Sequence, residues 1–199
     1  MIEIYGDGQS GNCWKVRQIL DFTARPYRWQ EVNVLARETR TPAFLALNPN
    51  GKVPIVRLDD GTVLTESGAI LCHFAEGTPW LPERGLPRTR VLEWLFFEQY
   101  SHEPNVAVAR YWIHYLNAKD EYADRLPARW EGGYKALDVM ERRLGEHEWL
   151  TDAGPTVADV ALYAYTHVAG EGGFTLEGYP GVRAWLGRFA GLQHYGGLK

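Results

Sequence analysis

The chain has 199 residues, 45% of them hydrophobic and 23% charged, which is typical of a globular protein with one large core or two modest ones. Its formal net charge is −4 and it has no run of lysine or arginine, which argues against nucleic acid or an anionic membrane as the main partner. No stretch of 18 apolar residues occurs, so we expect no transmembrane helix. Two cysteines and the lack of a signal-peptide pattern lead us to expect a protein of the reducing cytoplasm.

The N-terminal part alternates strand and helix patterns, with period-two and helical spacing of apolar residues in turn. The predicted elements are strand, helix, strand, helix, strand, strand and helix, at residues 1–5, 12–23, 27–34, 37–47, 53–58, 62–65 and 66–75. Asp60-Gly61 between the two short strands is a hairpin signal. The order β-α-β followed by β-β-α predicts an α/β domain of the thioredoxin-like type over residues 1–76.

The composition changes between residues 77 and 87, where three prolines and two glycines indicate a linker. Residues 88–199 follow, with long apolar-periodic runs at 88–115 and 126–144, and predict an all-α helical domain. Thr156 to Asp159 opens another helix. There Asp159 can bond back to the Thr156 amide in a shortened relative of the capping box. The predicted architecture is therefore a thioredoxin-like α/β domain followed by an all-α helical domain.

Several motifs in this order resemble the cytosolic glutathione S-transferase superfamily, in its bacterial Ser/Cys-type branch. They are Ser10 at the first strand–helix junction, Asn-Pro-Asn-Gly-Lys-Val-Pro at 48–54, Glu-Ser-Gly-Ala-Ile at 66–70, Thr-Val-Ala-Asp at 156–159 and Pro-Gly-Val-Arg-Ala-Trp at 180–185. The resemblance implies a homodimeric glutathione transferase with glutathione as co-substrate. Such an enzyme activates the glutathione thiol for attack on a hydrophobic electrophile.

The resemblance also implies where glutathione binds. In this superfamily the bond before Pro54 is cis and turns the backbone of Val53 toward the cysteinyl part of glutathione. Glu66 and Ser67, at a helix N-terminus that favours an anion, would hold the γ-glutamyl group. Lys52 and Arg40 would face the glycyl carboxylate. By themselves, these residues are also compatible with strand punctuation, an ordinary helix start and two solvated cations.

Ser10 is the residue that the resemblance assigns to thiol activation. The thiol of glutathione has a pKa near ~9, so only about 1% is thiolate at pH 7. A hydroxyl that donates to the sulfur favours the charged form. The alternatives are Cys13 as a redox-active thiol or as a small buried hydrophobe, Tyr5 as an activating phenol, and Asn12 as a helper of Ser10. Cys72 fits a buried hydrophobe.

Polar and aromatic residues within the 88–115 run are candidates for lining the electrophile pocket: Gln99, Ser101, His102, Arg110 and Trp112. The alternative is that they pack the helical domain, with a kink at Pro104. None of the six histidines has metal-ligand spacing, so we expect no metal. Two rival functions stay open: a glutathione-dependent peroxidase or disulfide reductase, and a non-catalytic, stress-related binding protein of the same fold.

Overall fold

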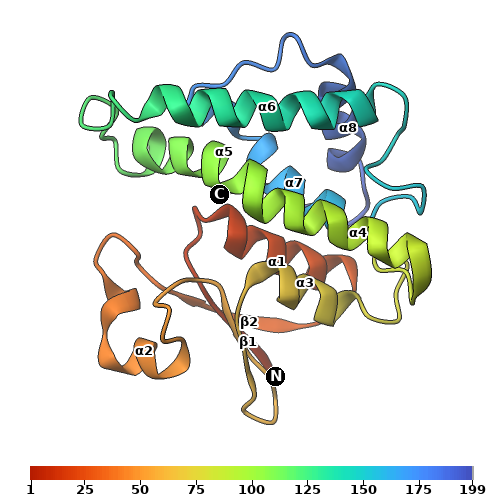
Figure 1. Ribbon diagram of the computed structural model, residues 1–199. Coiled ribbons are helices and arrows are strands. Elements are labelled where there is room, and N and C mark those ends of the chain that lie inside the picture. Colours follow the sequence, from red (N-terminus) through yellow and green to blue (C-terminus); the bar gives the residue numbers. More distant parts are fainter. Residues whose placement is uncertain (199) are drawn as a thin grey trace. The chain divides into compact units, whose positions relative to one another are not determined.

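A computed structural model describes residues 1–198 (Figure 1). These residues form two compact units. Unit 1 comprises Met1–Thr78 together with the described residues from Gln193 on. Unit 2 comprises Pro79–Leu192 and is helical. The predicted thioredoxin-like α/β domain followed by a helical domain is confirmed. The return of the chain to unit 1 after residue 192 is a feature that the sequence patterns did not suggest.

A four-stranded mixed sheet organises unit 1. Its strands are β1 (Ile2–Gly6), β2 (Tyr27–Glu31), β3 (Ile55–Arg57) and β4 (Val63–Leu64), in the spatial order β2-β1-β3-β4. β1 runs parallel to β2, whereas β3 is antiparallel to both β1 and β4. The parallel pair results from the predicted β-α-β crossover, and the antiparallel pair from the predicted hairpin.

Helices α1 (Gly11–Phe22) and α3 (Ser67–Ala75) pack against each other, as Figure 1 shows. Their apolar faces and the central strands form the main core of unit 1, with buried Ile4, Val16, Ile19, Leu20, Val56, Ile70, Leu71 and Phe74. The stretch predicted as one helix at 37–47 is divided into η1 (Glu38–Arg40) and α2 (Pro42–Leu47). The division falls there because Thr41 caps α2, accepting from the Phe44 amide at 3.3 Å, and proline favours the first helical position.

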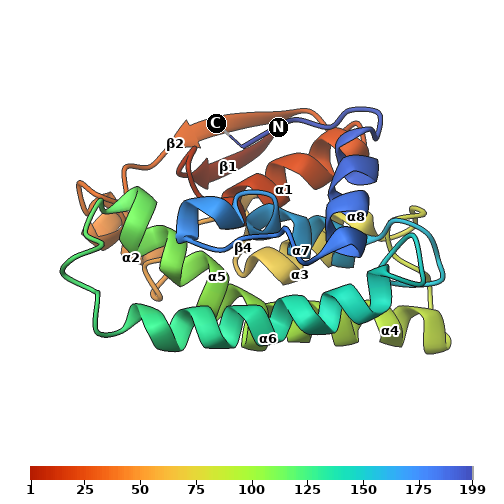
Figure 2. The ribbon, with the colours of Figure 1, turned by 90° about the horizontal axis from the view of Figure 1, so that it is seen from above.

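Unit 2 consists of helical segments of three kinds. The α-helices are α4 (Gly85–Phe97), α5 (Glu103–Arg110), α6 (Leu126–Leu144), α7 (Val157–Thr166) and α8 (Pro180–Ala190). The π-helical segments are η2 (Glu98–His102) and η3 (Tyr111–Tyr115), and η4 (Ala169–Gly172) is a 3-10 turn. Figure 2 shows α6 alongside α4 and α5. Every residue of α7 is buried, so α7 forms the centre of this unit.

The run from α4 to η3 is helical throughout, and Pro104 is the second residue of α5, directly after the π-helical η2. The Glu103 amide bonds to the Glu98 carbonyl, five residues back. Proline has no N–H, and its ring crowds the carbonyl of the preceding turn. A wider π turn at this point accommodates the missing donor and the ring. Within residues 1–198, no helix is long and apolar enough to cross a membrane.

Asp159 joins α7 to two other parts of unit 2 and is fully buried. Its Oδ2 accepts from the Thr156 amide at 2.9 Å, and the predicted capping box is confirmed. Its Oδ1 accepts from the Leu150 amide at 3.2 Å and from the Trp185 indole at 3.0 Å. Burial nevertheless outweighs these hydrogen bonds and raises the pKa of Asp159 to about 6.

This raised pKa predicts a pH dependence of stability. A carboxyl whose pKa is higher in the folded than in the unfolded chain stabilises the fold at low pH, and loses that contribution as pH rises through about 6. We expect the free energy of unfolding of the wild-type protein, relative to that of Asp159→Asn, to be about 1 kcal/mol larger at pH 5 than at pH 7, so that the wild type is relatively more stable at pH 5. Urea unfolding of both proteins at the two pH values measures this difference. If the difference in stability between the two proteins is the same at pH 5 and pH 7, Asp159 does not titrate in this range.

Candidate functional site

Ser10 lies at the junction of β1 and α1 and is the N-cap of α1. Its Oγ accepts from the Cys13 amide at 3.4 Å, and its own amide donates to the Asp7 carbonyl at 3.0 Å. The side chain is half-buried. Because the oxygen accepts at the cap, its O–H can still be donated, which is the property that a thiol-activating hydroxyl needs.

Two carboxylates hold the loop that carries Ser10. Asp7 is buried, and its two oxygens accept from the amides of Gln9 at 2.9 Å and Val34 at 3.4 Å. Glu31 on β2 accepts from the Gly8 amide at 3.0 Å. Neither Asp7 nor Glu31 was predicted from the sequence to be part of the site. The Asp7-Gly8 pair directly after a strand, a turn signal, could have pointed to Asp7.

Cys13 lies inside unit 1, three residues after Ser10, and is fully buried. Its Sγ packs near Gly6, where an added Cβ would lie 3.1 Å from the sulfur. Burial raises the pKa of Cys13 to about 12. Because the thiolate is the reactive form, Cys13 fits a small buried hydrophobe, one of the alternatives given by the sequence.

We therefore expect no alkylation of Cys13 by iodoacetamide in the native protein at pH 8. At that pH only about one thiol in 10,000 is ionised when its pKa is about 12. Peptide mass spectrometry after labelling, with a guanidinium-unfolded sample as the positive control, measures the modified fraction. Labelling of Cys13 in the native protein as fast as in the unfolded one would contradict its assignment as a buried, unreactive thiol.

The start of α3 lies beside the start of α1. Glu66 is the N-cap of α3 and adopts φ 65°, a left-handed conformation that is uncommon for a residue other than glycine. Ser67, only 6% exposed, donates from Oγ to Oδ1 of Asn12 at 3.5 Å. Lys15, also buried, donates to the same oxygen at 2.8 Å. Asn12 thus connects the Ser67 end of α3 to the Ser10 end of α1.

The Asn-Pro-Asn-Gly-Lys-Val-Pro loop is held by its own polar groups. Asn48 is buried and donates from its side-chain amide to the Lys52 carbonyl at 2.8 Å. Arg40 lies over the same loop and donates to the Asn50 carbonyl at 3.4 Å. Lys52 and Arg40 are both exposed, and the Val53–Pro54 bond is cis. The structure thus brings Arg40 next to the loop that contains Lys52 and Val53.

Tyr5 is engaged on β1. Its hydroxyl donates to Glu3 at 3.3 Å, and the Arg57 guanidinium lies 5.8 Å from the centre of its ring. Burial raises the pKa of the Tyr5 phenol. A phenol that already donates to a carboxylate is a poor donor to a second partner, so Tyr5 fits a strand residue.

Two of the residues considered for an electrophile pocket are buried in unit 2. His102 is fully buried, and its Nε2 lies 3.0 Å from the Thr166 hydroxyl on α7. Arg110 is 5% exposed and donates from Nε to Glu171 at 2.6 Å. Both side chains join elements of the helical unit to each other.

The other three candidates differ in their surroundings. Trp112 on η3 stacks on Tyr122, with ring centres 4.5 Å apart and planes at 7°. Ser101 accepts at its carbonyl from the Asn105 side chain at 2.7 Å, and Gln99 is exposed. Gln99 and Ser101 belong to the π-helical η2, a kind of segment that is frequent at functional sites.

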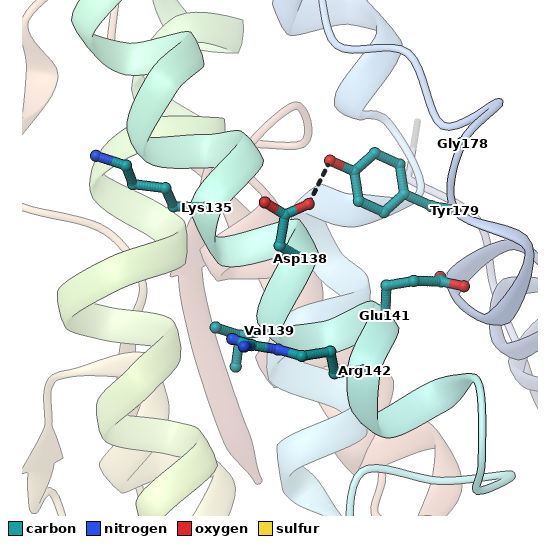
Figure 3. Close-up of a pocket in the computed structure, with 7 residues that line it drawn as sticks. All are labelled: Lys135, Asp138, Val139, Glu141, Arg142, Gly178 and Tyr179. Carbon is teal, nitrogen blue, oxygen red and sulfur yellow. Dashed lines mark hydrogen bonds between the residues drawn. The ribbon is translucent and has the colours of Figure 1, made fainter.

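A groove of about 640 Å³ lies on unit 2, between α6 and the segment before α8 (Figure 3). It is lined by Lys135, Asp138, Val139, Glu141, Arg142, Gly178 and Tyr179. The Tyr179 hydroxyl donates to Asp138 at 2.9 Å, and Glu141 accepts from the amides of Gly181 and Val182 at the start of α8. Burial and Asp138 raise the pKa of Tyr179 to about 12. The two carboxylates in the groove, Asp138 and Glu141, therefore hold the start of α8. None of the site residues predicted from the sequence lines the groove.

No group of three or more histidine, cysteine, aspartate or glutamate side chains in the described part of the chain could hold a metal ion. At the starts of α1 and α3, unit 1 brings together hydroxyls, a side-chain amide, the Lys15 ammonium and backbone groups. Such groups suit a polar, anionic organic molecule.

Family models match both parts of the chain. Residues 9–76 match the glutathione S-transferase N-terminal domain, and residues 123–188 match the glutathione S-transferase C-terminal domain. Among curated relatives, glutathione S-transferase F13 of Arabidopsis thaliana is 30% identical, covering 92% of this chain and 88% of that protein. Maleylacetoacetate isomerase of Pseudomonas aeruginosa and disulfide-bond oxidoreductase YfcG of Escherichia coli are each 28% identical, covering 92% and 93% of this chain and 88% of each relative.

Solved structures show the same relationship. A glutathione S-transferase from Xanthobacter autotrophicus Py2 is 54% identical with a TM-score of 0.97, covering 100% of this chain and 97% of that one. A glutathione S-transferase from Pseudomonas fluorescens Pf-5 is 48% identical with a TM-score of 0.97, covering 99% and 98%. Ure2p in complex with glutathione shares the fold at 22% identity and a TM-score of 0.83, covering 97% and 91%. The chain belongs to the glutathione S-transferase family.

Proposed function

We propose that this protein is a glutathione transferase of the Ser type, in which the Ser10 hydroxyl activates the glutathione thiol. The observation that carries the proposal is the adjacency of two helix starts in unit 1. Ser10 caps α1, Ser67 begins α3, and Asn12 connects them through the 3.5 Å contact with the Ser67 hydroxyl. A ligand with a thiol at one end and an α-amino acid group at the other can reach both.

Ser10 acts by stabilising the thiolate. Its Oγ already accepts from the Cys13 amide, and accepting one hydrogen bond strengthens the bond that the hydroxyl donates. Lowering the thiol pKa from ~9 to about 7 requires about 2.7 kcal/mol. One charge-assisted hydrogen bond and the positive end of α1 together can supply this amount. The serine keeps its proton, so no base beside it is required.

The rest of glutathione is proposed to bind along unit 1. Glu66 and Ser67 would hold the ammonium and carboxylate of the γ-glutamyl group, which the free amides at the start of α3 favour. The backbone of Val53 would pair with the cysteinyl residue. Lys52 and Arg40 would face the glycyl carboxylate, supported by the contact of Arg40 with the loop that contains Lys52.

The electrophile is proposed to be hydrophobic and to be held by the helical unit, with detoxification as the general role. Exposed Gln99 and half-buried Ser101 are the candidates best suited to direct contact. Trp112 is the third candidate, with its ring stacked on Tyr122 and the Arg129 guanidinium 5.8 Å from the ring centre. His102 and Arg110 would act by holding the helices that carry the other three, in keeping with their buried contacts. We also propose a cytoplasmic location, supported by the two cysteines, which are not joined in a disulfide.

A glutathione-dependent disulfide reductase is the second candidate. The observation that favours it is the 28% identity with the relative named disulfide-bond oxidoreductase. In that case the thiolate of glutathione, rather than a protein cysteine, would attack the disulfide, because Cys13 is buried with a raised pKa.

Calorimetric titration with glutathione tests the proposal, followed by turnover of 1-chloro-2,4-dinitrobenzene, cumene hydroperoxide and 2-hydroxyethyl disulfide. Specific binding together with the highest turnover on the aryl chloride supports the transferase. Binding with turnover only of the disulfide or hydroperoxide would favour the reductase or peroxidase. Absence of glutathione binding would remove both candidates and leave a binding protein of the same fold.

A homodimer is also proposed, supported by exposed aromatic side chains on one helical run. Phe96 on α4 is 72% exposed and Tyr100 on η2 is 87% exposed. Such large apolar side chains, close together at a surface, are typical of interaction sites. We expect Tyr100→Glu to shift the protein from dimer to monomer in sedimentation velocity. Leu35→Glu, at an apolar position of unit 1 that is 53% exposed, is the control that should leave the dimer intact.

A further inference from the structure

Residues 194–197, here named the strap, lie on α1 although they follow unit 2 in the chain. The Trp14 indole donates to the Gly196 carbonyl at 2.5 Å, and Arg17 donates to the Gly197 carbonyl at 2.8 Å. The Tyr195 ring contacts the Trp14 ring edge-on, with centres 6.4 Å apart. The strap is therefore recognised mainly through its backbone.

Gln18 makes the most specific contact with the strap. Its amide nitrogen donates to the His194 carbonyl at 2.9 Å, and its amide oxygen accepts from the Gly196 amide at 2.8 Å. The side chain is 1% exposed, so both ends of a buried amide are satisfied by the strap. His194 itself adopts φ 66°, a conformation that a non-glycine residue keeps only where its surroundings hold it. Gln18 and the strap thus fit each other closely.

The three α1 residues that hold the strap share one face of the helix, at positions i, i+3 and i+4. Trp14 is also one turn from Ser10, and the Trp14 amide donates to the Ser10 carbonyl at 2.9 Å. A helix that is held at Trp14 and Gln18 has a fixed first turn. The position of the Ser10 hydroxyl depends on that turn.

We propose that the strap is a positioning element for thiol activation. Through Gln18 and Trp14 it holds the first turn of α1, and with it the Ser10 hydroxyl. The inference rests on the proposed function, because it concerns how Ser10 is aimed at the sulfur. Gln18 and Trp14 are positioning residues, since they contact the strap and act through Ser10.

The test compares Gln18→Met with Val16→Ala. Gln18→Met removes both hydrogen bonds to the strap at nearly constant volume, whereas Val16→Ala removes buried methyl groups from α1 without touching the strap. Gly196→Pro, which removes the amide that donates to Gln18, is a second variant at a half-buried position should Gln18→Met fail to fold. The readouts are hydrogen exchange of the Cys13 and Trp14 amides and the pKa of the bound glutathione thiol.

For Gln18→Met we expect these two amides to exchange about tenfold faster than in Val16→Ala, and the thiol to ionise about tenfold less readily. If both variants change the two readouts equally, the strap only adds stability and the inference is overturned. Faster exchange with an unchanged thiol pKa also overturns it. If the wild-type protein does not bind glutathione, the proposed function is wrong. The hydrogen-exchange comparison still tests whether the strap holds the first turn of α1, because it needs no ligand.

Discussion

Replacing Ser10 with glycine is expected to raise the pKa of the bound glutathione thiol from about 7 to about 8.5, because the hydroxyl is lost whereas the positive end of α1 remains. At pH 6.5 the thiolate fraction then falls by roughly 25-fold, and turnover of an aryl chloride falls with it. Glycine removes the donated hydrogen bond but is a nearly equivalent N-cap, with a stability cost of only a few tenths of a kcal/mol. The change therefore separates the chemical role of the hydroxyl from its role at the start of α1.

The thiolate absorbance of bound glutathione as a function of pH measures this pKa directly. Ser10→Thr keeps a hydroxyl and an N-cap and is expected to keep most of the shift. Cys13→Ala is expected to keep all of it, because the Cys13 thiol is buried with a raised pKa. If the low pKa survives in Ser10→Gly, backbone amides at the start of α1 or the Asn12 amide stabilise the thiolate in place of Ser10.

Gly181→Ala is expected to lower the free energy of unfolding by about 3 kcal/mol, because no space exists for the added methyl group. A Cβ at position 181 would lie 2.6 Å from the Gly145 nitrogen and 2.7 Å from the Leu144 carbonyl carbon. Both are backbone atoms at the end of α6, so the methyl group cannot be relieved by a side-chain rotation. The start of α8 would have to move, and with it the bond from the Gly181 amide to Glu141 at 2.8 Å.

Gly187→Ala in the same helix is the matched control. An added Cβ at position 187 meets no atom within 4 Å, and alanine is a better helix former than glycine. We expect this variant to be more stable than the wild-type protein by about 0.5–1 kcal/mol. Urea unfolding followed by tryptophan fluorescence measures both. Equal stability of Gly181→Ala and the wild type would mean that α6 and α8 separate at little cost.

Local patterns along the chain were sufficient for most elements of the fold. The strands at 1–5 and 27–34, the hairpin at Asp60-Gly61 and the helix at 126–144 were predicted because alternation, turn residues and helical spacing act over a few residues. The hydrogen bond that the Thr156 amide donates to Asp159 was predicted for the same reason, since it links residues three apart. The cis bond before Pro54 was expected only through the family resemblance.

The sequence by itself therefore determined the order of the elements, the two-part architecture and the position of Ser10 at a helix start. Tertiary structure decided how the site is held together. The Asn12–Ser67 contact spans 55 residues, and the contacts of Gln18 with the strap span 176 and 178. The tertiary structure also decided that Cys13 is buried and that its pKa is raised, because both depend on the surrounding core. Burial and contacts over such separations arise only when the whole chain packs, and no local pattern encodes them.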